Sequence, residues 1–179
     1  MACSISAGST FTCADKSLVG GTQSYVYLAN LSNVASFTET LGAVSAITFD
    51  NAPGLIKFEI AKNSGSAGSE IEVQDGGNKL WKHSVNFNIS ALDQDDVNIV
   101  EDLARSEVIA IFVDRNKTIR IYGRENGLDL IADVQNTGTV AGSNVLAQLQ
   151  LQGQEGSRPQ QFLATDYETS IALLESYLF

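Results

Sequence analysis

The stretch that decides the fold runs from residue 108 to residue 154: VIAIFVDRNKTIRIYGRENGLDLIADVQNTGTVAGSNVLAQLQLQGQ. Its first run, residues 108–113, is almost continuously apolar and ends in Asp114-Arg115-Asn116-Lys117, which is typical of a buried strand entering a polar turn. Asn126-Gly127 is a turn dipeptide, and residues 145–152 alternate between apolar and polar side chains. Three or four strands in succession, with no helical periodicity between them, predict an antiparallel meander with one apolar and one polar face.

Similar patterns predict further strands before this stretch, at residues 24–31, 46–49, 55–60, 70–75 and 80–89. Lys62–Ser69 is rich in Gly and Ser and is predicted to be flexible, and Asp75-Gly76-Gly77-Asn78 is a hairpin turn signal. Residues 61–81 are therefore predicted to form a long hairpin whose tip projects from the body. Residues 34–44 are mixed in character and are expected to form a loop or a turn of helix.

Two helices are predicted. Residues 90–93 resemble a capping box, and Leu92, Ile99, Val100 and Leu103 recur at helical spacing, so we expect a helix over 91–106. Asp166 can cap a second helix within 164–179; the alternative is a tail that orders only against a neighbouring subunit. Residues 1–23 are expected to be an extended arm or a disordered terminus. The predicted class is mainly β (α+β), with two packed antiparallel sheets and one flanking helix in a domain over 24–163.

Composition limits the function. The chain has 179 residues, about one domain, and its 11 Lys+Arg against 21 Asp+Glu give a net charge of −10. That balance argues against a protein that grips nucleic acid through its phosphates. No apolar run approaches the ~20 residues of a membrane helix, and we see no secretory signal, so synthesis in the cytoplasm is expected. Cys3 and Cys13 are expected to be plain thiols, although a disulfide fits their spacing.

The residue types needed for catalysis are sparse. Because the chain has a single histidine, any triad would have to use His83, which lies among Trp81, Val85 and Phe87 on one side of a predicted strand and is expected to be a core or interface residue. The acidic run at 93–96 is better explained by helix capping than by calcium binding. We therefore predict no enzyme, cofactor or metal site. An alternative function is a monomeric β-sandwich that binds glycans or a host surface through exposed Trp81 and Tyr122.

Several segments together resemble the structural tail proteins of tailed bacteriophages. They are CSISAG (3–8), CADKSLVGG (13–21), DRNKTIRIYG (114–123), ENGLDL (125–130), LQLQGQE (149–155) and PQQFL (159–163). In particular, the chain is similar to the tail-tube or tail-hub proteins of crAss-like and related phages of Bacteroidetes. The resemblance implies packed antiparallel sheets that close into rings of six copies, whose inner strands form a β-cylinder around a channel for DNA. It also implies a place in the virion tail, other tail proteins above and below the ring, no sequence-specific DNA binding and no membrane.

In that family a long loop of one subunit reaches over its neighbour. Here the hairpin would take that role, and its candidate interface residues are Lys62, Ser64, Ser66, Glu70, Glu72, Asp75, Asn78 and Trp81. Candidate channel-lining residues come from the polar faces of 55–60 and 128–152, although outer solvated faces would have the same pattern: Lys57, Glu59, Asp129, Gln148, Gln150 and Gln152. A basic cluster is predicted to be an inter-subunit surface or a solvated face: Arg115, Lys117, Arg120 and Arg124. Whether the protein is a tube or a hub component is left open.

Overall fold

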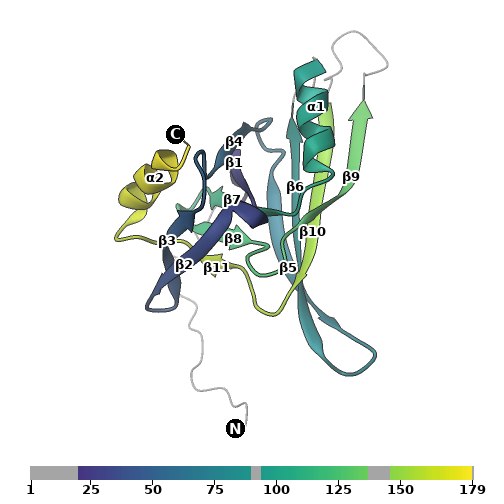
Figure 1. The fold of residues 1–179 in the computed structure, drawn as a ribbon. Helices are drawn as coiled ribbons and strands as arrows, with labels where there is room; N and C mark the ends of the chain where they lie inside the picture. Colours follow the sequence, from purple (N-terminus) through teal and green to yellow (C-terminus); the bar gives the residue numbers. More distant parts are fainter. Residues whose placement is uncertain (1–19, 90–93, 137–145, 179) are drawn as a thin grey trace.

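A computed structural model describes residues 20–89, 94–136 and 146–178. They form packed antiparallel sheets with two helices (Figure 1), so the predicted class, mainly β with packed sheets, is confirmed. Most of the predicted N-terminal arm and the residues of the predicted capping box lie outside the described residues. The elements in chain order are β1 (Thr22–Asn30), the 3-10 turn η2 (Leu31–Asn33), β2 (Val34–Thr40), β3 (Ala43–Phe49), β4 (Ile56–Glu59), β5 (Ser66–Val73), β6 (Lys79–Ile89), α1 (Gln94–Leu103), β7 (Val108–Asp114), β8 (Ile119–Tyr122), β9 (Asp129–Asn136), β10 (Leu146–Glu155), β11 (Gln160–Gln161) and α2 (Tyr167–Ser176).

The central layer is a five-stranded sheet in the order β11–β8–β7–β1–β4. Its middle strand, β7, is covered on both faces. Ile109 and Ile111 belong to one hydrophobic core, whereas Ala110 and Phe112 belong to the other. A strand with two buried faces has no polar side, which explains why residues 108–113 are continuously apolar.

A four-stranded sheet in the order β5–β6–β10–β9 packs on one face of the central sheet. β10 pairs antiparallel with β6, with Leu149 opposite Phe87 and Leu151 opposite Val85. These four side chains are buried against Phe112 of β7, and each such burial contributes about 1.5–3 kcal/mol. The predicted alternation of β6 and β10 is therefore confirmed, since their apolar residues face the core.

The β2–β3 hairpin and α2 cover the other face of the central sheet. Asp166 is the N-cap of α2, because its Oδ1 accepts a hydrogen bond of 2.8 Å from the backbone N–H of Thr169. Leu174 of α2 packs in the same core as Phe162 and Tyr27. The C-terminal segment is thus a helix that packs on its own chain, as one of the two predicted alternatives states.

The predicted single meander over 108–154 is wrong. β8 pairs with β7 and β11, whereas β9 pairs with β10 in the four-stranded sheet. The chain crosses between the sheets over residues 123–128, where Gly123 (φ 71°) and Gly127 (φ 79°) adopt positive φ values that glycine tolerates without strain. A backbone bridge between Val108 and Leu128 holds the crossing next to β7.

Two local predictions are also wrong. Residues 34–44 are not a loop or helical turn, because 34–40 form β2 and pair with β3. Register shifts between Val34 and Ser36 and between Thr38 and Glu39 break the alternation that would have revealed the strand. The segment Lys62–Ser69 is not a flexible loop throughout, because its last four residues begin β5 and pair with β6.

Candidate assembly surfaces and channel wall

The outer face of the four-stranded sheet, which points away from the central sheet, is rich in amide side chains. Gln148 lies opposite Asn88 and Gln150 opposite Asn86, while Leu149 between them is buried in the core. Residues directly opposite each other on paired strands share one face of the sheet. The four amides line a shallow depression of about 230 Å³. Ala132 and Val134 of β9 lie beside them on the same face, so the centre of the face is uncharged. We call the four amide side chains the amide face.

Charged side chains lie around the amide face. Asp129 of β9 is opposite Gln152, and on the hairpin Glu70 forms an ion pair of 3.4 Å with Lys82. Glu72 accepts a hydrogen bond of 2.7 Å from the amide of Gln154. Four of the six predicted channel-lining residues, at positions 129, 148, 150 and 152, therefore lie on the outer face of the four-stranded sheet.

The other two predicted channel residues, Lys57 and Glu59, lie on a different surface. Lys57 is opposite Tyr27 in the β1–β4 pair, on the face of the central sheet that α2 covers. Its Nζ is 2.8 Å from Oε1 of Glu175 and 4.7 Å from the ring centre of Tyr25. A single channel wall within one subunit therefore cannot contain all six residues. Lys57 instead ties β4 to α2.

The electrostatics around Lys57 are those of a structural contact. Glu175 accepts hydrogen bonds from Lys57 and from the hydroxyl of Tyr27, the latter at 2.5 Å, and both lower the pKa of its carboxyl. Burial raises the pKa of Tyr25 to about 12. Burial, followed by the bond to Glu175, also raises the pKa of Tyr27. Both tyrosines therefore stay protonated at neutral pH.

The predicted hairpin residues other than Trp81 fall into two groups. Ser64 is engaged within its own chain, because its hydroxyl donates to the carbonyl of Ala61 (2.6 Å) and accepts from the N–H of Asn88 (3.3 Å). The acidic pair on β5 is engaged with Lys82 and Gln154, as described above. The remaining exposed members are Lys62 and Ser66 at the start of the hairpin and Asp75 and Asn78 in its turn.

The inner side of the hairpin carries apolar residues that lie outside the two hydrophobic cores. Ile71 is opposite Trp81 and Val73 is opposite Lys79, yet Ile71 is 50% exposed and Val73 is 62% exposed. We call these four residues the hairpin face. The Arg158 guanidinium lies 5.1 Å from the ring centre of Trp81. The alternation of 70–75 could have identified the two aliphatic residues as one face, but only the fold reveals that the face extends past the core.

His83 lies at the base of the hairpin with both ring nitrogens occupied. The N–H of Gly123 donates to Nδ1 at 3.2 Å, and Nε2 lies 3.0 Å from the carbonyl oxygen of Ser157, to which it must donate. Only the neutral ring with its proton on Nε2 satisfies both partners. Burial lowers the pKa of His83, which favours the same neutral form. The predicted role of a satisfied core histidine fits this geometry.

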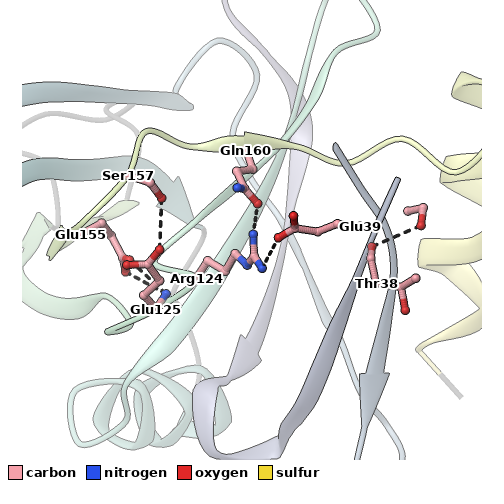
Figure 2. A network of polar contacts seen from close by, with 8 residues as sticks. Thr38, Glu39, Arg124, Glu125, Glu155, Ser157 and Gln160 are labelled. Carbon is pink, nitrogen blue, oxygen red and sulfur yellow. Dashed lines mark hydrogen bonds and ion pairs between the residues drawn. The ribbon is translucent and has the colours of Figure 1, made fainter. Parts of the chain in front are cut away.

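A network of polar contacts fixes the crossing between the sheets (Figure 2). Glu155 is 1% exposed, and its carboxylate accepts hydrogen bonds of 3.0 Å from the backbone N–H groups of Glu125 and Asn126. Burial raises the pKa of Glu155. Figure 2 shows Arg124 reaching from the crossing to Glu39 of β2, at 2.5 Å, and to Gln160 of β11. The crossing is therefore tied to three other elements.

The predicted basic cluster is largely paired within the chain. Arg115 contacts Asn63, and Lys117 forms an ion pair of 3.2 Å with Glu168. Arg124 is held by Glu39, as described above. The role of Tyr122 as an exposed stacking platform is wrong, because its side chain is 5% exposed and packs between the sheets against Phe112.

The sheets have open edges. Within the described residues, β5 pairs only with β6 and β9 pairs only with β10, so each leaves one side without a strand partner. β4 is likewise the last strand at its end of the central sheet. Such edges are surfaces to which another strand can be added.

Among the described residues, no group of three or more His, Cys, Asp or Glu side chains is placed to hold a metal ion. In the same part of the chain, no helix is long and apolar enough to cross a bilayer. Both cysteines lie outside it. The fold and its surfaces thus define a mainly β domain with open sheet edges and a projecting hairpin. Comparisons with protein-family models, with curated proteins and with solved structures found no match for this chain.

Proposed function

We propose that this chain is a non-enzymatic structural protein that assembles with copies of itself into rings, and that the rings form a tail tube or tail hub through which phage DNA passes. The observation that carries the proposal is the four-stranded sheet, which combines two open edges with an uncharged amide face. The place in the virion tail, the six-fold ring and the neighbouring tail proteins come from the resemblance described above.

The open edges favour self-assembly. β5 and β9 lie at opposite edges of one sheet and are each 8 residues long. An exposed strand of this length promotes uncontrolled pairing in a monomer, and closing the sheet removes the problem. Pairing β5 of one copy with β9 of the next would continue the sheet from subunit to subunit. A closed ring of such pairs leaves no free edge in this sheet.

The amide face suits a wall along which DNA moves. Lysine and arginine side chains bind phosphates by releasing counterions, so a basic wall would hold DNA in place. Gln148, Gln150, Asn86 and Asn88 carry no charge, and the net charge of −10 adds a weak repulsion towards DNA. This face therefore offers hydrogen-bonding groups to water without attracting the DNA backbone.

The alternative function, glycan binding by a monomer, requires Trp81 and Tyr122 to be exposed for stacking on a sugar. Tyr122 is buried, and Arg158 lies over the ring of Trp81.

The proposal is tested by the mass and shape of the purified protein over a range of concentrations. We expect an annulus of six copies in negative-stain images and a matching mass by light scattering. A protein that stays monomeric at high concentration, and that forms no ring when tail partners are added, would refute the proposal. A ring with no open centre would support self-assembly but refute the channel.

A further inference from the structure

We infer that the hairpin face of one copy docks into an apolar groove between β4 and α1 of a second copy, in a head-to-tail contact. This inference rests on the proposed self-assembly and names a second pair of surfaces that would meet, in addition to the β5 and β9 edges. The hairpin face consists of Ile71, Val73, Lys79 and Trp81, as defined above.

The receiving groove is lined by Ile56 and Phe58 of β4, by Ile99, Asp102 and Leu103 of α1 and by neighbouring residues of β1. Its volume is about 240 Å³, which is below the ~300–1,000 Å³ that is typical of small-molecule sites. Ile56 is 48% exposed and Ile99 is 46% exposed. Two half-exposed isoleucines at the mouth of a small groove suit the side chains of another protein better than a cofactor.

The two surfaces lie at opposite ends of the molecule, so one chain cannot join its own. The hairpin leaves the body beside β8 and β11, where His83 contacts Gly123 and Ser157 and Arg158 lies over Trp81. β4 is the opposite edge strand of the same sheet. Figure 1 shows the β5–β6 turn projecting below the body, whereas β4 and α1 lie near its top. A contact between different surfaces of identical copies is heterologous, and such contacts build rings when the rotation closes.

Charge complementarity identifies the occupant as a second copy. The hairpin face carries Lys79, and Arg158 lies against Trp81. The groove is lined by Asp102, and Asp95 is exposed on the same helix. Neither Lys79 nor Asp102 has an ion-pair partner among the described residues.

Two of the three acidic side chains of the hairpin point away from this contact, and the third, Asp75, lies in the turn beyond the hairpin face. Glu70 and Glu72 lie on the other side of the hairpin, where Lys82 and Gln154 engage them. An apolar centre with a basic rim on one surface and an acidic rim on the other is the arrangement that steers two proteins together and sets their orientation.

A complementation experiment tests the contact, because a heterologous interface can be broken on either side. Ile71→Asp breaks the hairpin face and leaves the groove intact, whereas Ile99→Asp breaks the groove and leaves the hairpin face intact. Each variant alone should self-associate at least tenfold more weakly in sedimentation velocity. When the two are mixed in equal amounts, the intact hairpin face of one should bind the intact groove of the other and restore a mixed pair.

Three controls accompany the mixture. Leu41→Asp changes an exposed leucine in the β2–β3 turn, outside both surfaces, and should self-associate like the unchanged protein. Circular dichroism should show that the variants keep their fold, since the substituted side chains are exposed. As a second test, Lys79→Glu should weaken association, and adding Asp102→Lys to it should restore much of the loss.

The outcomes separate this inference from the proposed function. If both isoleucine variants assemble like the unchanged protein, or if mixing them restores nothing, the contact is refuted while ring formation stands. If complementation succeeds but only pairs or open filaments form, the contact stands and the proposed channel fails. A protein that is monomeric at every concentration refutes both.

Discussion

The buried histidine gives the sharpest quantitative prediction. The neutral ring of His83 accepts from Gly123 and donates to Ser157, and burial lowers its pKa below the usual 6.5. Protonation would turn Nδ1 into a donor facing the N–H of Gly123. The His83 side chain therefore takes up a proton near pH 6.5 in the unfolded chain, but only at lower pH in the folded protein. Stability is full above the unfolded pKa and falls as the pH drops from about 6.5 towards the lowered pKa of the folded state.

The size of this effect follows from linkage. One proton bound only by the unfolded state changes the free energy of unfolding by about 1.4 kcal/mol per pH unit. Between pH 7.5 and pH 5.5, we therefore expect the unfolding free energy to fall by up to about 1.4 kcal/mol because of this group. His83 is the single histidine of the chain, so no other imidazole titrates in this window.

Urea unfolding at several pH values, for the unchanged protein and for His83→Gln, measures the effect. The glutamine variant should be less stable at pH 7.5 but should lose the histidine-dependent slope. Glu155 contributes with the opposite sign, because burial raises its pKa and its protonation favours the folded state. The difference between the two proteins removes that contribution. Equal pH slopes for the two proteins would refute the assignment of the neutral, doubly bonded ring.

Two further predictions test the crossing and the channel wall. Gly153→Ala should destabilise the protein, because an added Cβ would collide with the carbonyl oxygen of Gly127. Gly68→Ala is the control: no atom lies within 4 Å of its added carbon, so it should be neutral or stabilise the protein by up to about 1 kcal/mol. Equal melting temperatures for the two variants would contradict the close approach at Gly153. Gln150→Lys places one cation per subunit on the amide face and should make assembled rings retain DNA in a salt-dependent manner. Thr48→Lys, an exposed position on β3 on the other side of the molecule, is the matched control; equal DNA retention by both variants would argue against the amide face as the wall.

Much of the local structure could be predicted from the sequence. The alternation of residues 80–89 and 145–152 reflects strands with one buried face, and the structure buries Phe87 and Leu149 as that pattern requires. The continuous apolar run of 108–113 belongs to a strand that is buried on both faces. Asp166 caps its helix because a side-chain oxygen at that position satisfies a free N–H group of the first turn. Each of these signals depends on a few neighbouring residues.

The strand β2 cannot be predicted from its sequence, and the reason is local. Its two register shifts interrupt the period of two, so the sequence of 34–40 lacks the signal by which strands are recognised. Pairing with β3 makes it a strand nonetheless.

The sequence by itself determined the mainly β character, the hairpin and the capping residue Asp166, because these follow from short-range periodicity and turn chemistry; whether the C-terminal segment packs as a helix on its own chain was decided by the fold. Only the tertiary structure decided which strands share a sheet. The crossing has positive φ at Gly123 and Gly127, and buried Glu155 holds the N–H groups of Glu125 and Asn126 between them. This arrangement leads β9 into the four-stranded sheet, and no local pattern encodes that choice. The tertiary structure also separated Lys57 from Gln150 and left Ile71 exposed. Alternation in the sequence shows which residues share one face of a strand. The packing of distant segments decides whether that face contacts the core, solvent or another subunit.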